Sequence, residues 1–406
     1  MSLDLSIRSF TLPAASDDVA YADTIPAVST TAPTSKLERF LAEDRATPYV
    51  VIDLDVVEAH YRALKDALPA ADVFYAVKAN PSPLILERLV DLGGCFDAAS
   101  ISEIVQVMAA GASPDRISYG NTVKKASDIA KAHAFGVDLF ALDSAAELEK
   151  IARHAPGARV FVRIVSSGEG SDWPLSHKFG CRPDQASDLL VRARDLGLVP
   201  YGVSFHVGSQ QRDPAQWRHM IAKAAGVFRD VAAAGIRLGL VNLGGGFPAG
   251  LRGGPVPDIR AYGRAIMAAM TEHFGRDLPA MIVEPGRGLV GNAGVLVTEV
   301  VLVAERGADD KAWVYLDVGM FGGLAETMEE AILYPIESDR GGPSRPVVLA
   351  GPTCDSADVL YEKADYRLPV SLASGDRLRV RCTGAYTTTY STVGFNGFAP
   401  LTTYCI

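Results

Sequence analysis

The sequence predicts an α/β protein with two domains, a (β/α)₈ (TIM) barrel followed by a mostly antiparallel β domain. Three observations support this prediction. Eight short apolar runs alternate with helix-like stretches over about 230 residues. Beyond about residue 292 the pattern changes to β-branched runs separated by Gly, Pro and Asp turns, with little helical periodicity. The length of 406 residues also fits about two domains.

The eight apolar runs are spaced as the parallel strands of a barrel would be. A doubly wound sheet would need only five or six strands, and every run but the last is followed by a helix-like stretch. The longer connection 166–185 contains Gly168, Gly170 and Trp173, so we predict a mobile lid there. The runs lie near residues 72–77, 94–98, 116–119, 138–142, 159–165, 200–206, 239–243 and 280–284.

These patterns also predict the domain boundaries. Residues 1–36 are rich in Ala, Ser, Thr and Pro without the pattern of a secretory signal, so we expect a poorly ordered extension. Residues 37–293 would form the barrel and residues 294–406 the β domain. The run 48–54 predicts a strand that could belong to either domain.

Composition excludes several classes of partner. A net charge of −9 argues against binding to nucleic acid, and no apolar run reaches the roughly 18 residues needed to span a bilayer. The five cysteines are scattered without CxxC or CxxH spacing, which predicts reduced thiols in a cytoplasmic protein and no metal site.

Lys78 is the first candidate for chemistry, because it ends the apolar run 72–77 and is followed at once by Asn80 and Pro81. In a pocket its ammonium would lose hydration, its pKa would fall, and the neutral amine could attack a carbonyl group. The alternative is a solvated lysine at the end of a strand.

Other candidates stand at the ends of the predicted strands, where barrels place their active sites. Each also has a structural alternative: His206 could be a core histidine, Asp97 a helix cap or surface carboxylate, and the three glycines a tight turn. Their convergence on one rim favours function. The set is Lys78, Asp97, Arg163, His206, Gly244, Gly245, Gly246 and Glu284.

These residue types suit a flat aromatic cofactor that carries a phosphate and an aldehyde. Three consecutive glycines let backbone N–H groups surround a phosphate, and Arg287 adds a fixed cationic fork. Lys78 would bind the aldehyde, Glu284 would keep a pyridine nitrogen protonated, and His206 could stack on the ring.

Nine motifs in order give the chain a family resemblance over roughly residues 40–406. It resembles the pyridoxal-phosphate-dependent decarboxylases of basic amino acids that have the alanine-racemase-like fold, above all the bacterial ornithine or lysine/ornithine enzymes. The motifs are Tyr75-Ala-Val-Lys-Ala-Asn80, Phe96-Asp-Ala-Ala-Ser100, Lys178-Phe-Gly180, His206-Val-Gly-Ser-Gln210, Gly244-Gly-Gly-Phe-Pro248, Glu284-Pro-Gly-Arg287, Gly351-Pro-Thr-Cys-Asp-Ser356, Gly384-Ala-Tyr386 and Phe395-Asn-Gly-Phe398.

The resemblance implies a role for each matching residue. Lys78 would carry the cofactor covalently, Glu284 would pair with the pyridine nitrogen, and His206 would stack on the ring, with Asp97 and Arg163 as nearby supports. The phosphate ligands would be Ser209, Gly245, Gly246, Arg287 and Tyr386.

The resemblance also implies an obligate homodimer with two shared active sites. Cys354 and Asp355 would reach the site of the partner subunit, where Cys354 is expected to donate the proton to Cα after CO₂ leaves. The alternative for Cys354 is a buried structural thiol.

The expected substrate is a basic amino acid, with L-ornithine yielding putrescine for polyamine biosynthesis and L-lysine yielding cadaverine as a secondary reaction. Relatives from animals have an acidic residue after a Leu-Tyr pair, but here Pro335 follows Tyr334. The contact to the distal amine is therefore open. We expect Asp355, Tyr334 and Phe395 at the substrate, with a carboxylate from the acidic stretch that holds Glu326, Glu329 and Glu330.

Two alternatives remain from the sequence. Diaminopimelate decarboxylase shares most of these motifs, but it usually has Glu where Asp355 stands, and its substrate has a second carboxylate that calls for a basic partner. A non-catalytic regulatory homologue is the other, although such proteins tend to lose cofactor contacts that are retained here at Lys78, Glu284 and Cys354.

Overall fold

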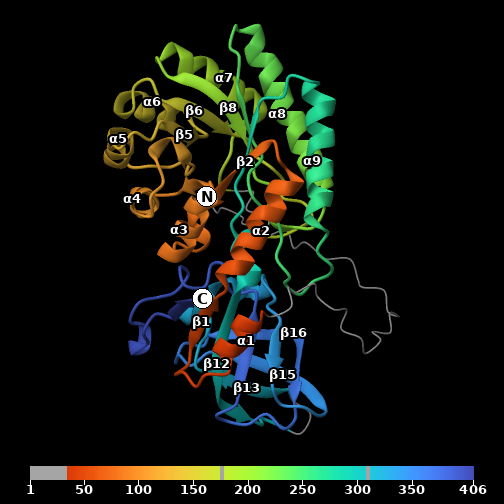
Figure 1. Cartoon of the computed structure of the whole chain (residues 1–406). Coiled ribbons are helices and arrows are strands. Elements are labelled where there is room, and N and C mark those ends of the chain that lie inside the picture. Colours follow the sequence, from red (N-terminus) through yellow and green to blue (C-terminus); the bar gives the residue numbers. More distant parts are fainter. Residues whose placement is uncertain (1–33, 174–177, 308–310) are drawn as a thin grey trace, which may run out of the picture.

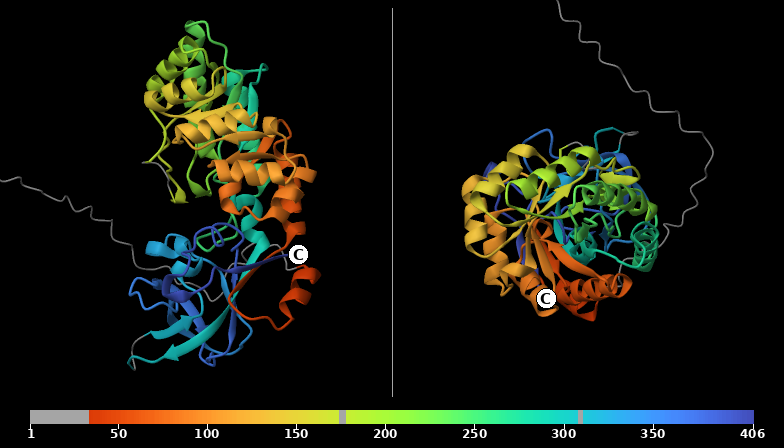
Figure 2. Two further views of the ribbon diagram at one scale, coloured as in Figure 1. Left: turned by 90° about the vertical axis from the view of Figure 1, so that its left-hand side faces the viewer. Right: turned by 90° about the horizontal axis from the view of Figure 1, so that it is seen from above.

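The computed structural model describes residues 34–173, 178–307 and 311–406, which form two domains, one above the other in Figure 1 and in the left view of Figure 2. The extension predicted for residues 1–36 lies outside the described residues except at its end. There, Thr34 caps helix α1 (Ser35–Leu41), because its side chain accepts a hydrogen bond from the Leu37 N–H group at 3.0 Å. The last two residues of the predicted extension are therefore helical.

The upper domain is a closed barrel of eight parallel strands, in the order β10-β11-β2-β3-β4-β5-β6-β8. Each strand coincides with one of the eight predicted apolar runs, which confirms the predicted barrel. The strands are β2 (Ala71–Ala76), β3 (Cys95–Ala98), β4 (Ile117–Tyr119), β5 (Leu139–Leu142), β6 (Arg159–Arg163), β8 (Val199–Ser204), β10 (Leu240–Asn242) and β11 (Ala280–Val283).

Helices form a ring around the barrel, as the view from above shows (Figure 2). Their apolar residues recur at helical spacing and pack on the strands, so that the main core lies between the helices and the barrel. The helices are α2 (Leu54–Ala67), α3 (Pro83–Asp91), α4 (Ile101–Ala109), α5 (Ala126–Ala134), α6 (Ala145–His154), α7 (Pro183–Asp195), α8 (Ala215–Ala233) and α9 (Ile259–Phe274).

The inside of the barrel has an apolar layer and, nearer the β domain, a polar layer. The apolar layer contains Phe161, Leu240 and Ile282 among its buried side chains. Because alternate residues of a strand face the same side, the residues two positions further along point inward at the carboxyl ends of the strands. Those residues are Arg163, Asn242 and Glu284, so the strand register itself places polar groups at the rim that faces the β domain.

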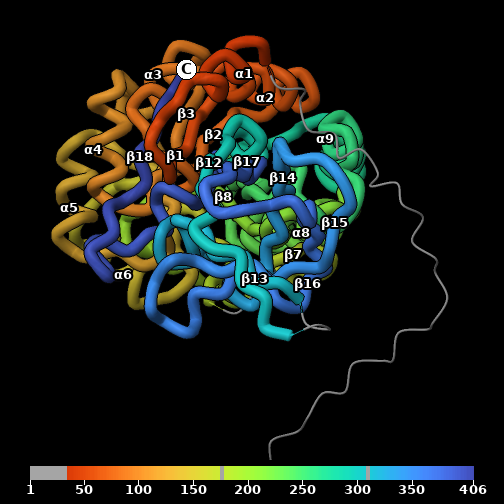
Figure 3. The backbone as a smooth tube through the Cα atoms, turned by 90° about the horizontal axis from the view of Figure 1, so that it is seen from below, coloured from red at the N-terminus to blue at the C-terminus, as the bar shows by residue number. Residues whose placement is uncertain are grey.

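The lower domain is built on an eight-stranded sheet with the main order β14-β17-β12-β13-β15-β16, while β1 pairs with β12 and with β18. Most pairings are antiparallel; β13 with β15 and β1 with β18 are parallel. The predicted strand 48–54 thus pairs within this sheet, as the view from below shows (Figure 3). The strands are β1 (Tyr49–Ile52), β12 (Gly294–Ala304), β13 (Ala312–Leu316), β14 (Ile336–Ser338), β15 (Ser344–Ala350), β16 (Val359–Pro369), β17 (Arg377–Arg381) and β18 (Thr402–Cys405).

The long connection after β6 contains a short strand of its own. Strand β7 (Ser171–Trp173) pairs antiparallel with β9 (Ser209–Gln211), which follows β8. Residues 174–177 of the connection lie outside the described residues, and the lid remains a prediction. Strand β7 therefore lies beside Ser209, one of the predicted phosphate ligands.

The segment that follows β2 is hydrogen-bonded to the β domain. The N–H of Tyr386 donates to the carbonyl of Ala79 at 2.9 Å, and the amide of Asn80 donates to the carbonyl of Gly384 at 2.9 Å. The segment that carries Lys78 is therefore fixed to the β domain. The short segments are η1 (Val77–Ala79), η2 (Pro114–Arg116), α10 (Arg287–Val290), η3 (Gly291–Ala293), η4 (Met320–Gly322), η5 (Ala325–Glu330) and η6 (Phe395–Gly397).

Candidate active site

Lys78 lies directly after β2 at the rim that faces the β domain, where its ammonium donates to Asp97 Oδ2 at 3.1 Å. Its side chain is 48% exposed, whereas that of Asp97 is 5% exposed. Burial is the largest influence on the pKa of Lys78 and lowers it, as we predicted. The negative charges around the amine, that of Asp97 first, and the hydrogen bond to Asp97 together outweigh burial and raise the pKa above its ordinary value. Without a bound ligand, Lys78 is thus a charged amine held by a carboxylate.

The position of the Asp97 side chain requires a glycine directly after the neighbouring strand β4. A Cβ at Gly120, just after β4, would lie within 1.8 Å of Asp97 Oδ1, so only glycine leaves room for the carboxylate. The Oδ1 atom itself is buried and has no hydrogen-bond partner in the described part of the chain. One oxygen of Asp97 therefore holds Lys78, and the other retains unused acceptor capacity.

Glu284 follows β11 and accepts a hydrogen bond of 2.5 Å from the side-chain amide of Asn242. The other atom of that amide, Oδ1, accepts from the N–H of Gly244, which fixes the orientation of Asn242. Burial, together with the charge of Asp97, raises the pKa of Glu284 to about 7. Its proton is therefore exchangeable near neutral pH.

His206 follows β8, and its Nδ1 atom accepts a hydrogen bond from the N–H of Gly208 at 3.0 Å. Burial, followed by the charges of Arg163 and Lys78, lowers the pKa of His206 to about 3. The ring is therefore neutral and carries its proton on Nε2. A neutral imidazole is suited to packing against the face of an aromatic ring.

Arg163 ends β6 inside the barrel, and its guanidinium lies 5.4 Å from the centre of the Phe179 ring. Burial lowers the pKa of Arg163, while the charges of Glu284, Asp143 and Asp97 oppose that shift. The rim thus combines two cations with two carboxylates, and its charges are balanced within a few residues.

The three glycines after β10 pack against the loop that follows β8. Gly244 and Gly246 have φ values of 65° and 102°, which favour glycine. A Cβ at Gly245 would lie 2.5 Å from the carbonyl oxygen of Glu284 and 3.3 Å from His206 Nε2. Side chains are thus excluded where the backbone must approach both Glu284 and His206.

Arg287 opens α10 beside this glycine loop and is almost fully buried, with 3% of its side chain exposed. Its Nη2 donates to Glu326 Oε1 at 2.5 Å, and the Tyr386 ring centre lies 5.0 Å from the guanidinium carbon. Its Nε and Nη1 atoms are buried and have no hydrogen-bond partner among the described residues. Buried N–H donors of this kind require an acceptor, and a phosphate would provide one.

Cys354 and Asp355 lie elsewhere, in the exposed turn between β15 and β16. The N–H of Cys354 donates to the side chain of Asn396 at 3.1 Å, and Asp355 accepts from the N–H of Ala357 at 2.9 Å. No hydrogen bond or ion pair of the described residues links either one to the barrel rim. Both side chains are thus accessible on the surface of a single chain.

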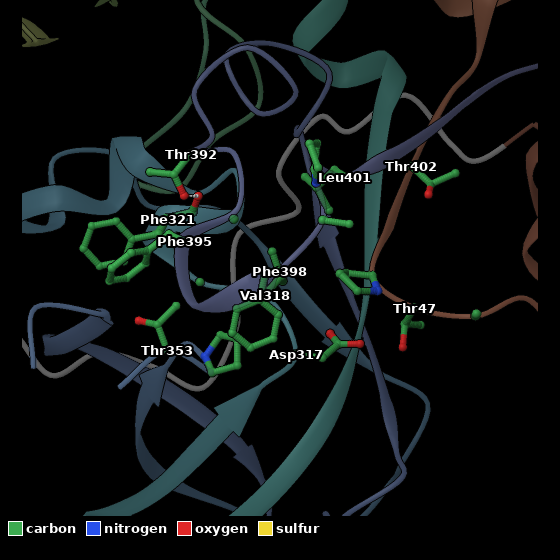
Figure 4. A pocket seen from close by; sticks show the side chains of 17 residues that line it. Thr47, Asp317, Val318, Phe321, Thr353, Thr392, Phe395, Phe398, Leu401 and Thr402 are labelled. Atoms are coloured by element: carbon green, nitrogen blue, oxygen red, sulfur yellow. Dashed lines mark hydrogen bonds between the residues drawn. The ribbon is translucent and has the colours of Figure 1, made fainter. Parts of the chain in front are cut away.

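Phe395 lines a cavity of about 220 Å³ within the β domain (Figure 4). Its ring packs on that of Phe321, with 5.0 Å between the ring centres. Thr353, next to Cys354, lines the same cavity. The cavity therefore adjoins the Cys354 turn and does not include Lys78.

The acidic stretch predicted to contact the substrate has two structural carboxylates. Glu326 is buried between Arg287 and Tyr334, whose hydroxyl donates to Oε2 at 3.2 Å. The carboxylate of Glu330 accepts from the N–H groups of Glu362, Lys363 and Ala364 at 2.7, 2.6 and 2.7 Å. Glu329 is exposed. Glu326 thus bonds both Arg287 and Tyr334, while the substrate contact expected for Glu326 and Tyr334 stays a prediction.

Comparison with known proteins identifies the family. Residues 54–291 match the pyridoxal-binding domain of the pyridoxal-dependent decarboxylases. The chain is also 37% identical over 363 residues to a lysine/ornithine decarboxylase of Selenomonas ruminantium, covering 88% of this chain and 89% of that protein. The chain belongs to the pyridoxal-dependent decarboxylases.

Solved structures of decarboxylases for basic amino acids share the whole fold. The lysine/ornithine decarboxylase of Vibrio vulnificus, complexed with cadaverine, has a TM-score of 0.82 and 33% identity over 91% of this chain and 98% of that one. The arginine decarboxylase of Paramecium bursaria Chlorella virus, bound to agmatine, has a TM-score of 0.83 and 30% identity over 92% and 100%. This decarboxylase is therefore a lyase of the basic amino-acid group, with pyridoxal phosphate as its cofactor.

The residues at the rim fit that cofactor. The unpartnered donors of Arg287 and the glycine loop beside them suit a phosphate. Lys78 offers an amine for the aldehyde, and Glu284 has a proton to share with a pyridine nitrogen. Within the described residues, no group of His, Cys, Asp and Glu could hold a metal ion, and no helix has the length and apolarity to cross a membrane.

Sequence reasoning missed three residues that support the site. Asn242 orients Glu284, Gly120 makes room for Asp97, and Asn80 fixes the Lys78 segment to the β domain. Asn242 ends β10 and lies near the end of the predicted run 239–243, so the rule that selected Glu284 could also have selected it. The roles of the other two depend on contacts across strands and domains, which the sequence does not reveal.

The raised pKa of Glu284 predicts a pH-dependent effect of Glu284→Gln on the cofactor-free protein. Because the folded pKa of about 7 exceeds the ordinary value of 4.5, protonation stabilises the fold. That stabilisation is fully present below about pH 4.5 and is lost as the pH rises through about 7. The variant does not titrate there, so its melting temperature relative to wild type should rise between about pH 5 and about pH 8. The change should correspond to about 1–3 kcal/mol.

The exposed Glu87→Gln on α3 controls for the loss of a surface carboxylate, and its difference from wild type should stay flat over this pH range. A Glu284→Gln difference that is equally flat would show that Glu284 does not carry a raised pKa.

Proposed function

We propose that this protein is a homodimeric decarboxylase that converts L-ornithine to putrescine and CO₂ and acts on L-lysine as a secondary substrate. The observation that supports the chemistry most strongly is the arrangement at one rim of Lys78 beside Asp97, the protonatable Glu284 and the unpartnered donors of Arg287. These groups match the aldehyde, the ring nitrogen and the phosphate of the family's cofactor.

The contributions of the chain follow from this arrangement. When bound, pyridoxal phosphate supplies an electron-accepting ring for the electron pair that remains when CO₂ leaves. Lys78 would hold its aldehyde, Glu284 would keep a proton at the ring nitrogen, and neutral His206 would stack on the ring face. The phosphate would lie at Ser209, at the loop of Gly244, Gly245 and Gly246, and at Arg287 and Tyr386, while Asp97 and Arg163 would support the site.

The proposed dimer rests on the position of Cys354 and Asp355. Both are exposed on the single chain and have no polar contact with the barrel rim, although each belongs to a motif of this family. A partner subunit would bring them to the Lys78 site. There the thiol of Cys354 would give its proton to Cα, replacing the carboxylate that leaves as CO₂.

The proposed preference for a cationic side chain rests on the carboxylates available near the site. A buried ammonium without a partner costs several kcal/mol, so its site needs an acidic group. Glu326 and Glu330 are already paired within the chain, which leaves Asp355 of the partner and the exposed Glu329 as candidates. A second carboxylate on the substrate, as in diaminopimelate, would have no basic partner in this acidic stretch.

A panel of amino acids tests the substrate proposal, with amine and CO₂ as readouts. L-Ornithine should give the highest kcat/KM, and L-lysine should follow within about 1–3 kcal/mol, because they differ by one methylene. Leucine and glutamate should not react. Asp355→Ala should raise KM for both diamino acids more than it weakens cofactor binding, while Asp365→Ala on β16 serves as the matched control. Higher kcat/KM for meso-diaminopimelate or L-arginine would refute the ornithine assignment and leave the cofactor assignment intact.

Mixing two inactive variants tests the shared sites. Lys78→Ala and Cys354→Ala homodimers should each be nearly inactive. After subunit exchange, half of the dimers are mixed and each has one intact site, so about a quarter of wild-type activity should return. If exchange is demonstrated by differently tagged subunits and no activity returns, Cys354 does not act across the dimer.

A further inference from the structure

The guanidinium of Arg287 is hydrogen-bonded at one of its nitrogen atoms and has no partner at the other two among the described residues. Its Nη2 atom is bound to Glu326 Oε1 at 2.5 Å, while Nε and Nη1 are buried and have no partner in the described ranges. The burial of Arg287 would lower its pKa, but the charge of Glu326 opposes this and raises it. The guanidinium is thus a fixed cation with two nitrogen atoms, Nε and Nη1, left to donate to an anion.

Glu326 is fixed as firmly as Arg287. Its side chain is 7% exposed, and its second oxygen accepts from the Tyr334 hydroxyl at 3.2 Å. The segment that carries it is attached to β16 through Glu330, which accepts three backbone hydrogen bonds there. Glu326 therefore cannot leave Arg287 without disrupting the packing of its own segment.

We infer that Glu326 is a positioning residue that orients Arg287 toward the phosphate of the cofactor and, by its fixed negative charge, limits how tightly that phosphate is bound. The inference rests on the proposed phosphate role of Arg287. Glu326 binds the guanidinium at Nη2, so the Nε and Nη1 atoms stay available for the phosphate.

The charge effect has a definite sign. Without phosphate, the charge of Glu326 compensates that of the buried Arg287 guanidinium. A bound phosphate brings further negative charge close to Glu326. Like charges on two sides of one guanidinium, in a site with little water, repel each other strongly enough to change the affinity for phosphate about tenfold. Glu326→Gln would remove the charge and keep an oxygen acceptor for Arg287 Nη2, while its NH2 group would face the Tyr334 hydroxyl, which can accept a hydrogen bond. It should therefore strengthen phosphate binding without releasing Arg287.

Comparison of two ligands separates this effect from a general structural defect. Pyridoxal phosphate and pyridoxal differ only in the phosphate group, and both can be titrated against cofactor-free enzyme by absorbance. Glu326→Gln should raise the ratio of the pyridoxal Kd to the pyridoxal phosphate Kd by about tenfold. A defect in packing would weaken both ligands and leave the ratio unchanged.

Glu330→Gln is the matched control, because it alters a carboxylate of the same segment that does not contact Arg287. It should lower the melting temperature and leave the ratio as in wild type. The rise in melting temperature that inorganic phosphate causes is a second measurement, and it can be made even if cofactor-free Glu326→Gln is less stable than wild type. At equal concentration, phosphate should raise the melting temperature of Glu326→Gln more than that of wild type.

An unchanged or lower ratio in Glu326→Gln, or an equal stabilisation by inorganic phosphate, would overturn the inference. Wild-type enzyme that binds pyridoxal as tightly as pyridoxal phosphate would overturn the phosphate role of Arg287 as well. The two failures are therefore distinguishable.

Discussion

The structure depends on the compensation of charges that the barrel encloses at the rim facing the β domain. A buried ammonium or guanidinium is tolerated only with a nearby carboxylate, and two cations at this rim have one as an ion-pair partner. Lys78 is paired with Asp97, and Arg287 with Glu326. These pairs keep the empty site intact, and they also leave specific atoms unused. Those atoms, Asp97 Oδ1 and two nitrogens of Arg287, mark where a ligand must complete the site.

The barrel register explains why these groups meet. Side chains that face inward alternate along each strand, so an apolar layer containing Phe161, Leu240 and Ile282 is followed by a layer of polar residues. The β domain then covers one side of the rim. The Tyr386 N–H donates to the carbonyl of Ala79, and the Gly384 carbonyl accepts from the side chain of Asn80, both next to Lys78. Neither domain alone would contain both Lys78 and Tyr386.

Much of the fold and part of the site could be predicted from the sequence. The eight barrel strands were predictable because each is a short apolar run between helical stretches, and Lys78 and Glu284 because each follows such a run. The sequence could not show which sheet the strand 48–54 joins, because an apolar run does not reveal its partner strand. It also could not show the pair of Arg287 with Glu326, because these residues lie in different domains and 39 positions apart. That long-range contact joins Glu326, which we expected at the substrate, to Arg287.

We propose that Lys78 is the residue that holds the cofactor. The most direct measurement is to load the purified protein with pyridoxal phosphate, reduce the lysine–aldehyde linkage with borohydride, and map the labelled peptide by mass spectrometry. We predict that the label lies on Lys78 and is absent from Lys78→Ala. A label on Lys124, Lys125 or Lys178 would contradict the assignment of Lys78 as the residue that holds the cofactor.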